Sequence, residues 1–215
     1  MARSSRLPPD ALQPYLLDVP HPRSPRWREL SSQPWPINWK ALFGNDHPVE
    51  IEVGFGKGMF LMNAGATWPG ANFLGIEIER KYVMLTAGRL AKRHIANVRL
   101  ACTDARWLLK ECVAAESVQA VHVYFPDPWW KQRHQKRKLF TADFAGQCAR
   151  VLVAGGTLHF VSDVEEYFEA TCAILAEQRV LRRMPSAPEA AGFSTSFERK
   201  YLKEGRTIYR AAWVK

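Results

Sequence analysis

The sequence predicts an α/β fold in which helices cover both faces of a mostly parallel sheet. Short runs rich in β-branched and aromatic residues alternate with longer stretches of helical periodicity, which is the order of parallel strands joined by crossover helices. The chain has 215 residues, 47% of them apolar, so it is long enough to bury a core of its own. No apolar run approaches the roughly 20 residues of a membrane-spanning helix, and we expect no membrane partner.

The first 48 residues are expected to form an irregular strap packed on the body of the protein. They hold nine of the fourteen prolines, and proline fixes the backbone and donates no hydrogen bond. Trp27, Trp35 and Trp39 offer apolar surface that would hold the strap in place. From Val49 onward the pattern changes, and residues 49–215 are expected to form a single domain.

Five strands and four helices follow from the periodicity of the next part of the chain. The expected strands are residues 49–53, 72–78, 97–102, 118–125 and 156–162. The expected helices lie near residues 57–67, 80–94, 140–151 and 164–178. Ser162 followed by Glu165 is typical of a capping box at the start of the last of these helices.

The C-terminal tail is expected to complete the sheet. Residues 193–202 and 206–214 are interpreted as an antiparallel pair, with Gly205 in the turn between them. The sheet would then have seven strands, of which the last runs antiparallel to the others.

The turn after the first strand has the features of a nucleoside cofactor site. Gly54, Gly56 and Gly58 form a GxGxG turn between a strand and a helix, which lets the backbone approach a ligand closely. The spacing differs from the GxGxxG of dinucleotide folds, and Lys57 lacks the following Ser or Thr of a P-loop. Glu52 would repel a pyrophosphate but suits a cation such as the amino group of methionine. These features favour S-adenosyl-L-methionine over NAD or ATP.

Acidic residues also stand at the ends of the second and third strands. Glu77 lies about 20 positions after the glycine turn, where a carboxylate commonly binds ribose hydroxyls. Asp104 is placed to accept a hydrogen bond from an adenine amino group. Each acid alone is also compatible with a helix N-cap or a surface carboxylate. Together the three acids resemble the pattern of S-adenosyl-L-methionine-dependent methyltransferases of Rossmann-like fold, whose last strand is antiparallel.

The fourth strand runs into the most informative motif of the chain, FPDPWWKQRHQKRKLF over residues 125–140. Asp127 is held between two prolines, beside the expected cofactor site. Trp129 and Trp130 offer flat apolar faces, and the stacking of a base on such a ring contributes roughly 1–3 kcal/mol. The basic residues from Lys131 onward would contact phosphates.

The positive charge of the chain is concentrated in two segments. The net charge is +9 and the pI is about 9.6. Residues 131–138 hold five basic and no acidic residues, and residues 179–215 hold nine basic and three acidic residues. The rest of the chain is close to neutral, so these segments predict a face that binds a polyanion such as RNA.

The motif closely resembles the signature of the bacterial tRNA (guanine-N7-)-methyltransferases. The resemblance covers about residues 49–215 and includes EVGFGKG, FLGIEI, the Asp104 turn, Ser162-Asp163 and the segment from Thr195 to Glu198. It implies that S-adenosyl-L-methionine donates a methyl group to N7 of a guanine in the variable loop of tRNA. This guanine is position 46 of the standard tRNA numbering, and the product is 7-methylguanosine.

The resemblance also implies which residues form the site. The cofactor site would comprise Glu52, Gly54, Gly56, Gly58, Glu77, Asp104 and Asp127, and Asp127 would also be the catalytic candidate. The substrate would be held by Lys131, Arg133, Lys136, Arg137, Asp163, Thr195, Ser196, Phe197 and Glu198. Two features depart from the family pattern: Trp130 stands where Pro or His is more usual, and the proline-rich N-terminus replaces a basic arm. These departures leave the fine positioning of the substrate and the mode of tRNA docking open.

The expected chemistry depends on alignment more than on proton transfer. Guanine N7 has a lone pair and no proton, so Asp127 need not act as a general base. Carboxylates at Asp127 and Asp163 could accept from guanine N1–H and N2–H₂ and favour the cationic product, with Glu198 as an alternative clamp. His122 and His159 are interpreted as sheet histidines with satisfied hydrogen bonds.

No metal is expected, and the cysteines are interpreted as thiols. The four cysteines form no CxxC pair and no metal-site spacing with a histidine. This pattern is typical of reduced cysteines, and we expect a cytoplasmic protein.

Other functions stay open on the sequence. Asp127-Pro128-Trp129 partly resembles the D/N-P-P-aromatic motif of adenine amino-group methyltransferases, although the second proline is missing. A non-catalytic tRNA-binding protein could use the same basic face, and it would not bind S-adenosyl-L-methionine. A small-molecule methyltransferase or aminopropyl transferase would show no salt-dependent RNA binding. The choice between a monomer and a homodimer is undecided.

Overall fold

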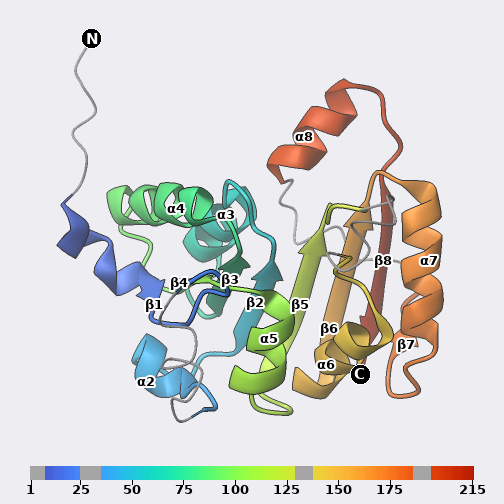
Figure 1. Cartoon of the computed structure of the whole chain (residues 1–215), viewed down its shortest axis with the longest axis horizontal. Coiled ribbons are helices and arrows are strands. Elements are labelled where there is room, and N and C mark those ends of the chain that lie inside the picture. Colours follow the sequence, from blue (N-terminus) through green and yellow to red (C-terminus); the bar gives the residue numbers. More distant parts are fainter. Residues whose placement is uncertain (1–7, 25–34, 129–137, 186–194) are drawn as a thin grey trace.

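An eight-stranded mixed sheet forms the centre of the protein, in the order β1-β4-β3-β2-β5-β6-β8-β7 (Figure 1). The computed structural model describes residues 8–24, 35–128, 138–185 and 195–215, without the side chain of Ser196. Neighbouring strands from β1 to β6 run parallel, and β8 runs antiparallel to both β6 and β7. The strands are β1 Leu16–Leu17, β2 Val49–Val53, β3 Asn72–Glu77, β4 Val98–Cys102, β5 Val118–Tyr124, β6 Leu152–Ser162, β7 Arg182–Arg183 and β8 Tyr209–Val214.

Helices cover both faces of this sheet, which confirms the predicted fold class. One cluster of buried side chains joins the strands to α3 and α4, and the other joins them to α5, α6 and α7. The helices are α2 Trp39–Phe43, α3 Met59–Thr67, α4 Arg80–Lys92, α5 Ala105–Trp107, α6 Ala142–Val151, α7 Glu165–Ala176 and α8 Ser196–Lys203. Short turns add the 3₁₀ segments η1 Pro9–Ala11 and η2 Gln13–Tyr15 and the π-helical segment η3 Leu108–Cys112.

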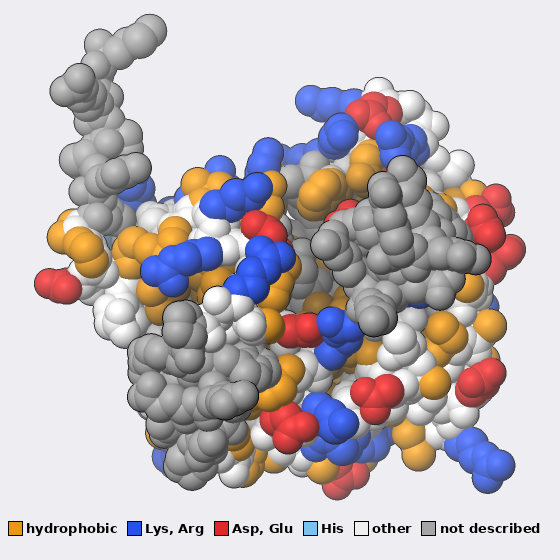
Figure 2. Space-filling view, viewed as in Figure 1, with side chains coloured by type: hydrophobic (Ala, Val, Ile, Leu, Met, Phe, Trp, Pro, Cys, Tyr) orange, Lys and Arg blue, Asp and Glu red, His pale blue; other side chains and the backbone are white. Residues whose placement is uncertain are grey.

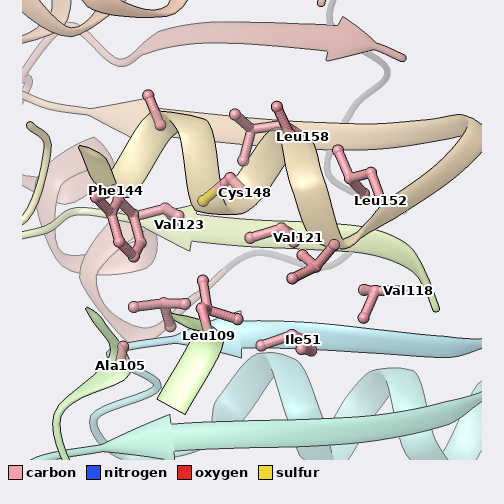
Figure 3. Packing of buried hydrophobic residues seen from close by; sticks show 14 of the residues in the cluster. Ile51, Ala105, Leu109, Val118, Val121, Val123, Phe144, Cys148, Leu152 and Leu158 are labelled. Carbon is pink, nitrogen blue, oxygen red and sulfur yellow. The ribbon is translucent and has the colours of Figure 1, made fainter. Parts of the chain in front are cut away.

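The central strands are buried on the face that α6 covers. Ile51, Val121 and Leu158 come from three adjacent strands and pack with Phe144 and Cys148 of α6 (Figure 3). Each of these five side chains is at most 1% exposed. Close packing of this kind makes the sheet a rigid platform, so the loops at the carboxyl ends of the strands start from fixed positions.

The N-terminal segment contributes a strand that the sequence did not predict. The two residues of β1 pair in parallel with β4. With β1 and β7 added, and without the strand expected at residues 193–202, the sheet has eight strands instead of seven. A two-residue strand among prolines has no periodicity to detect. Beyond it, the Thr103 hydroxyl donates to the carbonyl of Pro20 at 2.6 Å. Trp35 packs edge-on against Trp107 of α5, with ring centroids 5.9 Å apart.

Two local predictions at the C-terminal side are wrong. Residues 193–202 were expected to form a strand, but Ser196–Lys203 is the helix α8, and the antiparallel neighbours of β8 are β6 and β7. The reason is a capping box that starts α8 at Thr195. The capping box expected from Ser162 is absent: its hydroxyl accepts from the Val164 amide at 3.1 Å, and no side chain caps α7.

The last predicted strand of the parallel set starts earlier than expected. β6 begins at Leu152 instead of residue 156, and its pairing with β5 shifts register between Val118 and Ala120. α8 lies at the carboxyl end of β5, at the top of the molecule in Figure 1. This end of the sheet carries the residues considered next.

Candidate active site

The glycine turn after β2 adopts a conformation that depends on glycine. Gly54, Gly56 and Gly58 have φ angles of +74°, +51° and +67°, in the left-handed region that other residues rarely adopt. A Cβ on Gly58 would lie 2.3 Å from the Cγ2 atom of Thr86, so this glycine also allows α3 to begin close to α4. The turn at the carboxyl end of β2 therefore has a left-handed backbone without side chains at three positions, which leaves its backbone accessible to a ligand.

Glu52 places a buried carboxylate directly before this turn. Its side chain is 4% exposed, and its Oε2 atom has no hydrogen-bond partner in the described part of the chain. Burial, and secondarily the nearby charge of Glu77, raises the pKa of Glu52 to about 8. An unpartnered buried acceptor is costly, so this position fits a ligand that brings positive charge and N–H groups.

Glu77 ends β3 and faces the same turn. Its Oε2 accepts from the Gly56 amide at 2.9 Å, and its Oε1 accepts from the Glu79 amide at 3.0 Å. Burial raises the pKa of Glu77, although the hydrogen bonds from these amides act in the opposite direction. The carboxylate is thus fixed by the backbone, and each oxygen retains a lone pair for a ligand hydroxyl.

Asp104 at the end of β4 is the N-cap of α5. It accepts from the Arg106 amide at 2.9 Å and from the Arg106 guanidinium at 2.6 and 3.1 Å. Burial alone would raise the pKa of Asp104, but the hydrogen bonds from Arg106 outweigh it, so the pKa lies below its usual range. Asp104 is therefore a fixed anion at the strand end next to Glu77.

Asp127 is exposed at the end of β5. It follows Phe125, which has a positive φ of +51° and donates its amide to the Val161 carbonyl at 2.8 Å. Burial is the largest cause of the raised pKa values of Tyr167 and Tyr201, and the Asp127 charge adds a small part to both, so the carboxylate lies within electrostatic range of both phenols. The predicted residues Trp129, Trp130, Lys131, Arg133, Lys136 and Arg137 lie outside the described residues.

The segment from Thr195 to Glu198 begins α8 and is internally hydrogen-bonded. The Thr195 hydroxyl accepts from the Glu198 amide at 3.1 Å, and the Glu198 carboxylate accepts from the Thr195 amide at 3.3 Å. The second Glu198 oxygen pairs with the Arg210 guanidinium. Ser196 is the first residue of the helix. Glu198 is thus occupied as a structural cap and ion pair.

An aromatic cluster that sequence reasoning missed lies between α8 and the end of β5. The rings of Phe125 and Tyr201 have centroids 5.4 Å apart, and Phe197 lies 6.4 Å from Phe125 and 6.0 Å from Tyr201. Arg206 stacks over the Tyr201 ring at 4.5 Å and pairs with Asp163 at 2.7 Å. The spacing of Phe197 and Tyr201 by four residues would have signalled this cluster if α8 had been predicted as a helix.

The start of α8 closes a small pocket over the glycine turn. The pocket has a volume of about 10 Å³, enough for one water molecule. Phe197 is 43% exposed, and its Cε2 atom lies 3.6 Å from the position that a Cβ on Gly56 would take. The pocket is lined by Glu52, Gly54, Phe55, Lys57, Met59, Phe60, Tyr124, Thr195 and Phe197.

Within the described ranges, no group of three or more His, Cys, Asp or Glu side chains is arranged to hold a metal ion. The helices of the same part of the chain are too short or too polar to cross a membrane.

Comparison with known proteins identifies the family. A family model described as a putative methyltransferase matches residues 46–211. The tRNA (guanine-N(7)-)-methyltransferase of Rhodopirellula baltica is 43% identical over 194 residues, which cover 85% of this chain and 71% of that protein. The protein of the same name from Syntrophotalea carbinolica is 34% identical over 199 residues, which cover 91% of this chain and 84% of that protein. The chain belongs to the tRNA (guanine-N(7)-)-methyltransferase family. This confirms the resemblance inferred from the motif at the end of β5.

Solved structures support the fold class. A 30S ribosomal A1408 methyltransferase from an uncultured bacterium has a TM-score of 0.55 at 13% identity, covering 81% of this chain and 91% of that one. The aminoglycoside resistance methyltransferase NpmB1 has a TM-score of 0.55 at 15% identity, covering 86% of this chain and 96% of that one. At these identities the likeness concerns the fold alone, and it confirms a Rossmann-like methyltransferase architecture.

Proposed function

We propose that the chain transfers the methyl group of S-adenosyl-L-methionine to N7 of a guanine in the variable loop of tRNA. The proposal rests mainly on Glu52, whose Oε2 atom is buried beside the glycine turn without a hydrogen-bond partner in the described part of the chain. A cationic ligand with N–H groups would satisfy this oxygen. The amino group of S-adenosyl-L-methionine has this character. The family to which the chain belongs supports guanine N7 in tRNA as the acceptor.

The three acids and the glycine turn would hold the cofactor. Glu52 would accept from its amino group, Glu77 from the ribose hydroxyls and Asp104 from the adenine amino group. The open turn at Gly54, Gly56 and Gly58 would allow the backbone to contact it closely. When bound, S-adenosyl-L-methionine supplies an electrophilic methyl group on its sulfonium.

Asp127 would position the guanine and stabilise positive charge on it. No base is required, since N7 carries no proton, so the protein contributes mainly by alignment. Asp127 is exposed at the end of β5 and would accept from guanine N1–H or N2–H₂. Asp163 would share this role after exchanging its bond to Arg206, whereas Glu198 is already engaged in capping α8. We therefore favour Asp127 and Asp163 over Glu198 as the guanine clamp.

The aromatic cluster would support the base beside the cofactor pocket. Phe197 is exposed and lies over the glycine turn, so one of its faces is available for stacking. Thr195 and Ser196 would hold this ring in place as the beginning of α8.

Basic residues around the site would contact the tRNA backbone. Figure 2 shows Lys and Arg side chains over α8 and over the α4 side of the same edge. Those of α8 include Arg199, Lys200 and Lys203, all exposed. Lys131, Arg133, Lys136 and Arg137 would extend the same contact. Phosphate contacts of this kind make the affinity for tRNA fall steeply with salt concentration.

A methyl-transfer assay tests the proposal. Purified protein, isotopically labelled S-adenosyl-L-methionine and an unmodified tRNA transcript are combined, and the RNA is digested to nucleosides for mass spectrometry. The expected product is labelled 7-methylguanosine. Label on adenine or on a small molecule would contradict the proposed acceptor, and tRNA binding without transfer would favour a non-catalytic role.

A further inference from the structure

The N-terminal segment passes the end of the sheet at which the cofactor acids stand. β1 pairs in parallel with β4, with Leu17 opposite Ala101. Because the pairing is parallel, the chain leaves β1 at the carboxyl ends of the strands. Val19 and Pro20 follow and are both buried. The segment after β1 therefore lies at the edge of the sheet where α/β folds bind their ligands.

A first hydrogen bond joins this segment to the end of β4. The Thr103 hydroxyl donates to the carbonyl of Pro20 at 2.6 Å, and Thr103 is only 1% exposed. The Thr103 amide donates to the Glu77 carbonyl at 3.2 Å, so the same residue also joins β4 to β3. Thr103 directly precedes Asp104. The backbone from which Asp104 projects is thus held from both sides.

A second hydrogen bond joins the segment to the end of β3. Nε2 of His21 lies 3.0 Å from the carbonyl oxygen of Ile78, and the Arg23 amide donates to Nδ1 of His21 at 3.1 Å. A backbone N–H only donates and a carbonyl only accepts, so Nδ1 accepts and Nε2 donates. Two backbone groups therefore fix both the orientation of the ring and the position of its proton.

His21 and Glu77 bind the two ends of one peptide group. The carbonyl of Ile78 and the amide of Glu79 belong to the same planar unit. His21 donates to its carbonyl, and its amide donates to Oε1 of Glu77 at 3.0 Å. Hydrogen bonds in such a series strengthen one another. A change at His21 therefore reaches the Glu77 carboxylate through a single rigid group.

The segment also borders a cavity beside Glu77. The cavity has a volume of about 450 Å³, within the range of small-molecule sites, and its walls include His21 and Cys102. Cys102 is the register partner of Glu77 in the sheet. Burial raises the pKa of the Cys102 thiol, the charge of Arg80 lowers it and the charge of Glu77 raises it, so the thiol lies within electrostatic range of both.

We propose that Pro20 and His21 form a staple that fixes the ends of β3 and β4, and so aligns Glu77 and Asp104 on the nucleoside half of S-adenosyl-L-methionine. His21 and Thr103 would be positioning residues: His21 acts through Glu77, and Thr103 acts through Asp104. The inference rests on the proposed function, because the nucleoside is that of the cofactor.

Calorimetry with three ligands tests the staple in the full-length protein. The reference ligand is S-adenosylhomocysteine. The second ligand lacks the ribose 2′- and 3′-hydroxyls, and the third has hydrogen in place of the adenine amino group. The affinity of the reference divided by that of the second is the ribose ratio, and divided by that of the third it is the adenine ratio. Both should be about tenfold or more in the wild type, as for hydrogen bonds to a carboxylate.

Two substitutions separate the two halves of the staple. His21→Ala should lower the ribose ratio about threefold, the scale of one neutral hydrogen bond. Thr103→Val keeps the shape of the side chain without its donor, and should lower the adenine ratio by a similar factor. If Thr103→Val does not fold, His21→Ala decides alone, because His21 is partly exposed.

Three control variants distinguish positioning from packing. His21→Gln and Thr103→Ser retain a donor, so each should keep both ratios within a factor of two of the wild type. His47→Ala removes an exposed histidine outside the staple and should leave both ratios unchanged.

Each outcome decides one question. A wild-type protein that binds none of the three ligands contradicts the proposed function and the staple with it. Equal binding of all three would remove Glu77 and Asp104 as nucleoside ligands, and would also overturn the staple. Wild-type preference for the reference, with the same two ratios in His21→Ala and Thr103→Val, overturns the staple alone. Lower thermal stability with unchanged ratios would show that the segment serves packing only.

Discussion

The buried carboxyl of Glu52 couples the stability of the fold to pH, and Glu52→Gln should remove that coupling. Burial raises the pKa of Glu52 from 4.5 to about 8 because the ionised form is poorly solvated and lies near Glu77. Glutamine has the shape of the neutral carboxyl and does not ionise. The variant should therefore tolerate alkaline pH better than the wild type while losing the charge that a cationic cofactor needs.

The sign and size follow from the two pKa values. Between pH 4.5 and 8 the folded protein holds a proton on Glu52 that the unfolded chain has released, so the free energy of unfolding falls as pH rises. The stability that the folded protein gains from keeping Glu52 protonated is fully present below pH 4.5 and is lost above pH 8. Over the whole window it amounts to about 5 kcal/mol, at 1.36 kcal/mol for each pKa unit. Between pH 5.5 and 8.5 it amounts to about 3 kcal/mol.

Reversible denaturant unfolding at pH 5.5 and pH 8.5 measures this difference. The stability of Glu52→Gln relative to the wild type should rise by about 3 kcal/mol between the two pH values. Glu177→Gln, an exposed carboxyl-to-amide change on the protein surface, is the matched control and should follow the wild type. Parallel pH profiles for the wild type and Glu52→Gln would refute the reasoning. In calorimetry, Glu52→Gln should also bind S-adenosyl-L-methionine at least tenfold more weakly, as expected for a lost charged hydrogen bond.

Three further changes probe other parts of the site. Asp127→Ala should lower the single-turnover rate of methyl transfer by about a hundredfold or more, because a group that stabilises charge is lost. The thermal unfolding midpoint should stay unchanged, because the residue is exposed, and an unchanged rate would reject its role. Phe197→Ala should speed the association of S-adenosyl-L-methionine in stopped flow, because this ring closes the pocket, and should raise the KM for tRNA about tenfold through lost stacking. If both the association rate and the KM were unchanged, α8 would not be part of the site. Gly58→Ala should lower the free energy of unfolding by about 3 kcal/mol, because residue 58 has a positive φ and its new Cβ would clash with Thr86. Adding Thr86→Ala should recover part of the loss. Equal denaturant midpoints for Gly58→Ala and the wild type would contradict the close approach of α3 and α4.

The parallel core of the fold was predictable because its signals are local and strong. The strand at residues 49–53 matches β2, and the other parallel strands start or end within a few residues of their predicted bounds. Fully buried parallel strands produce continuous apolar runs, and glycine turns with acids mark their carboxyl ends. The order of the elements then implies a parallel sheet with helices on both faces.

The errors arose where local patterns compete with each other or carry no signal. Residues 193–202 contain aromatic residues that suit a strand, but the capping box of Thr195 and Glu198 decides for a helix. Ser162 had the capping-box spacing without the structure, because its hydroxyl turns to the backbone of Val164. The pairing of β1 depends on the edge of β4, which is remote in sequence.

The candidate site was predictable as a set of positions, but its internal bonds were not. Glu52, Glu77 and Asp104 do stand at three successive strand ends. Their surroundings differ: one is unpartnered, one is held by backbone amides and one is paired with Arg106. The contact of Asp163 with Arg206 joins residues 43 positions apart, which no sequence spacing reveals. Long-range contacts of this kind require the structure.

The most direct test of the central claim replaces one atom of the substrate. Two tRNAs are assembled that differ only at the variable-loop guanine, which is 7-deazaguanine in one of them, so that N7 becomes a C–H group. The account predicts methyl transfer to the unmodified tRNA, none to the deaza tRNA, and equal binding of both within a few-fold. Transfer of label to the deaza tRNA at a comparable rate would contradict guanine N7 in that loop as the acceptor.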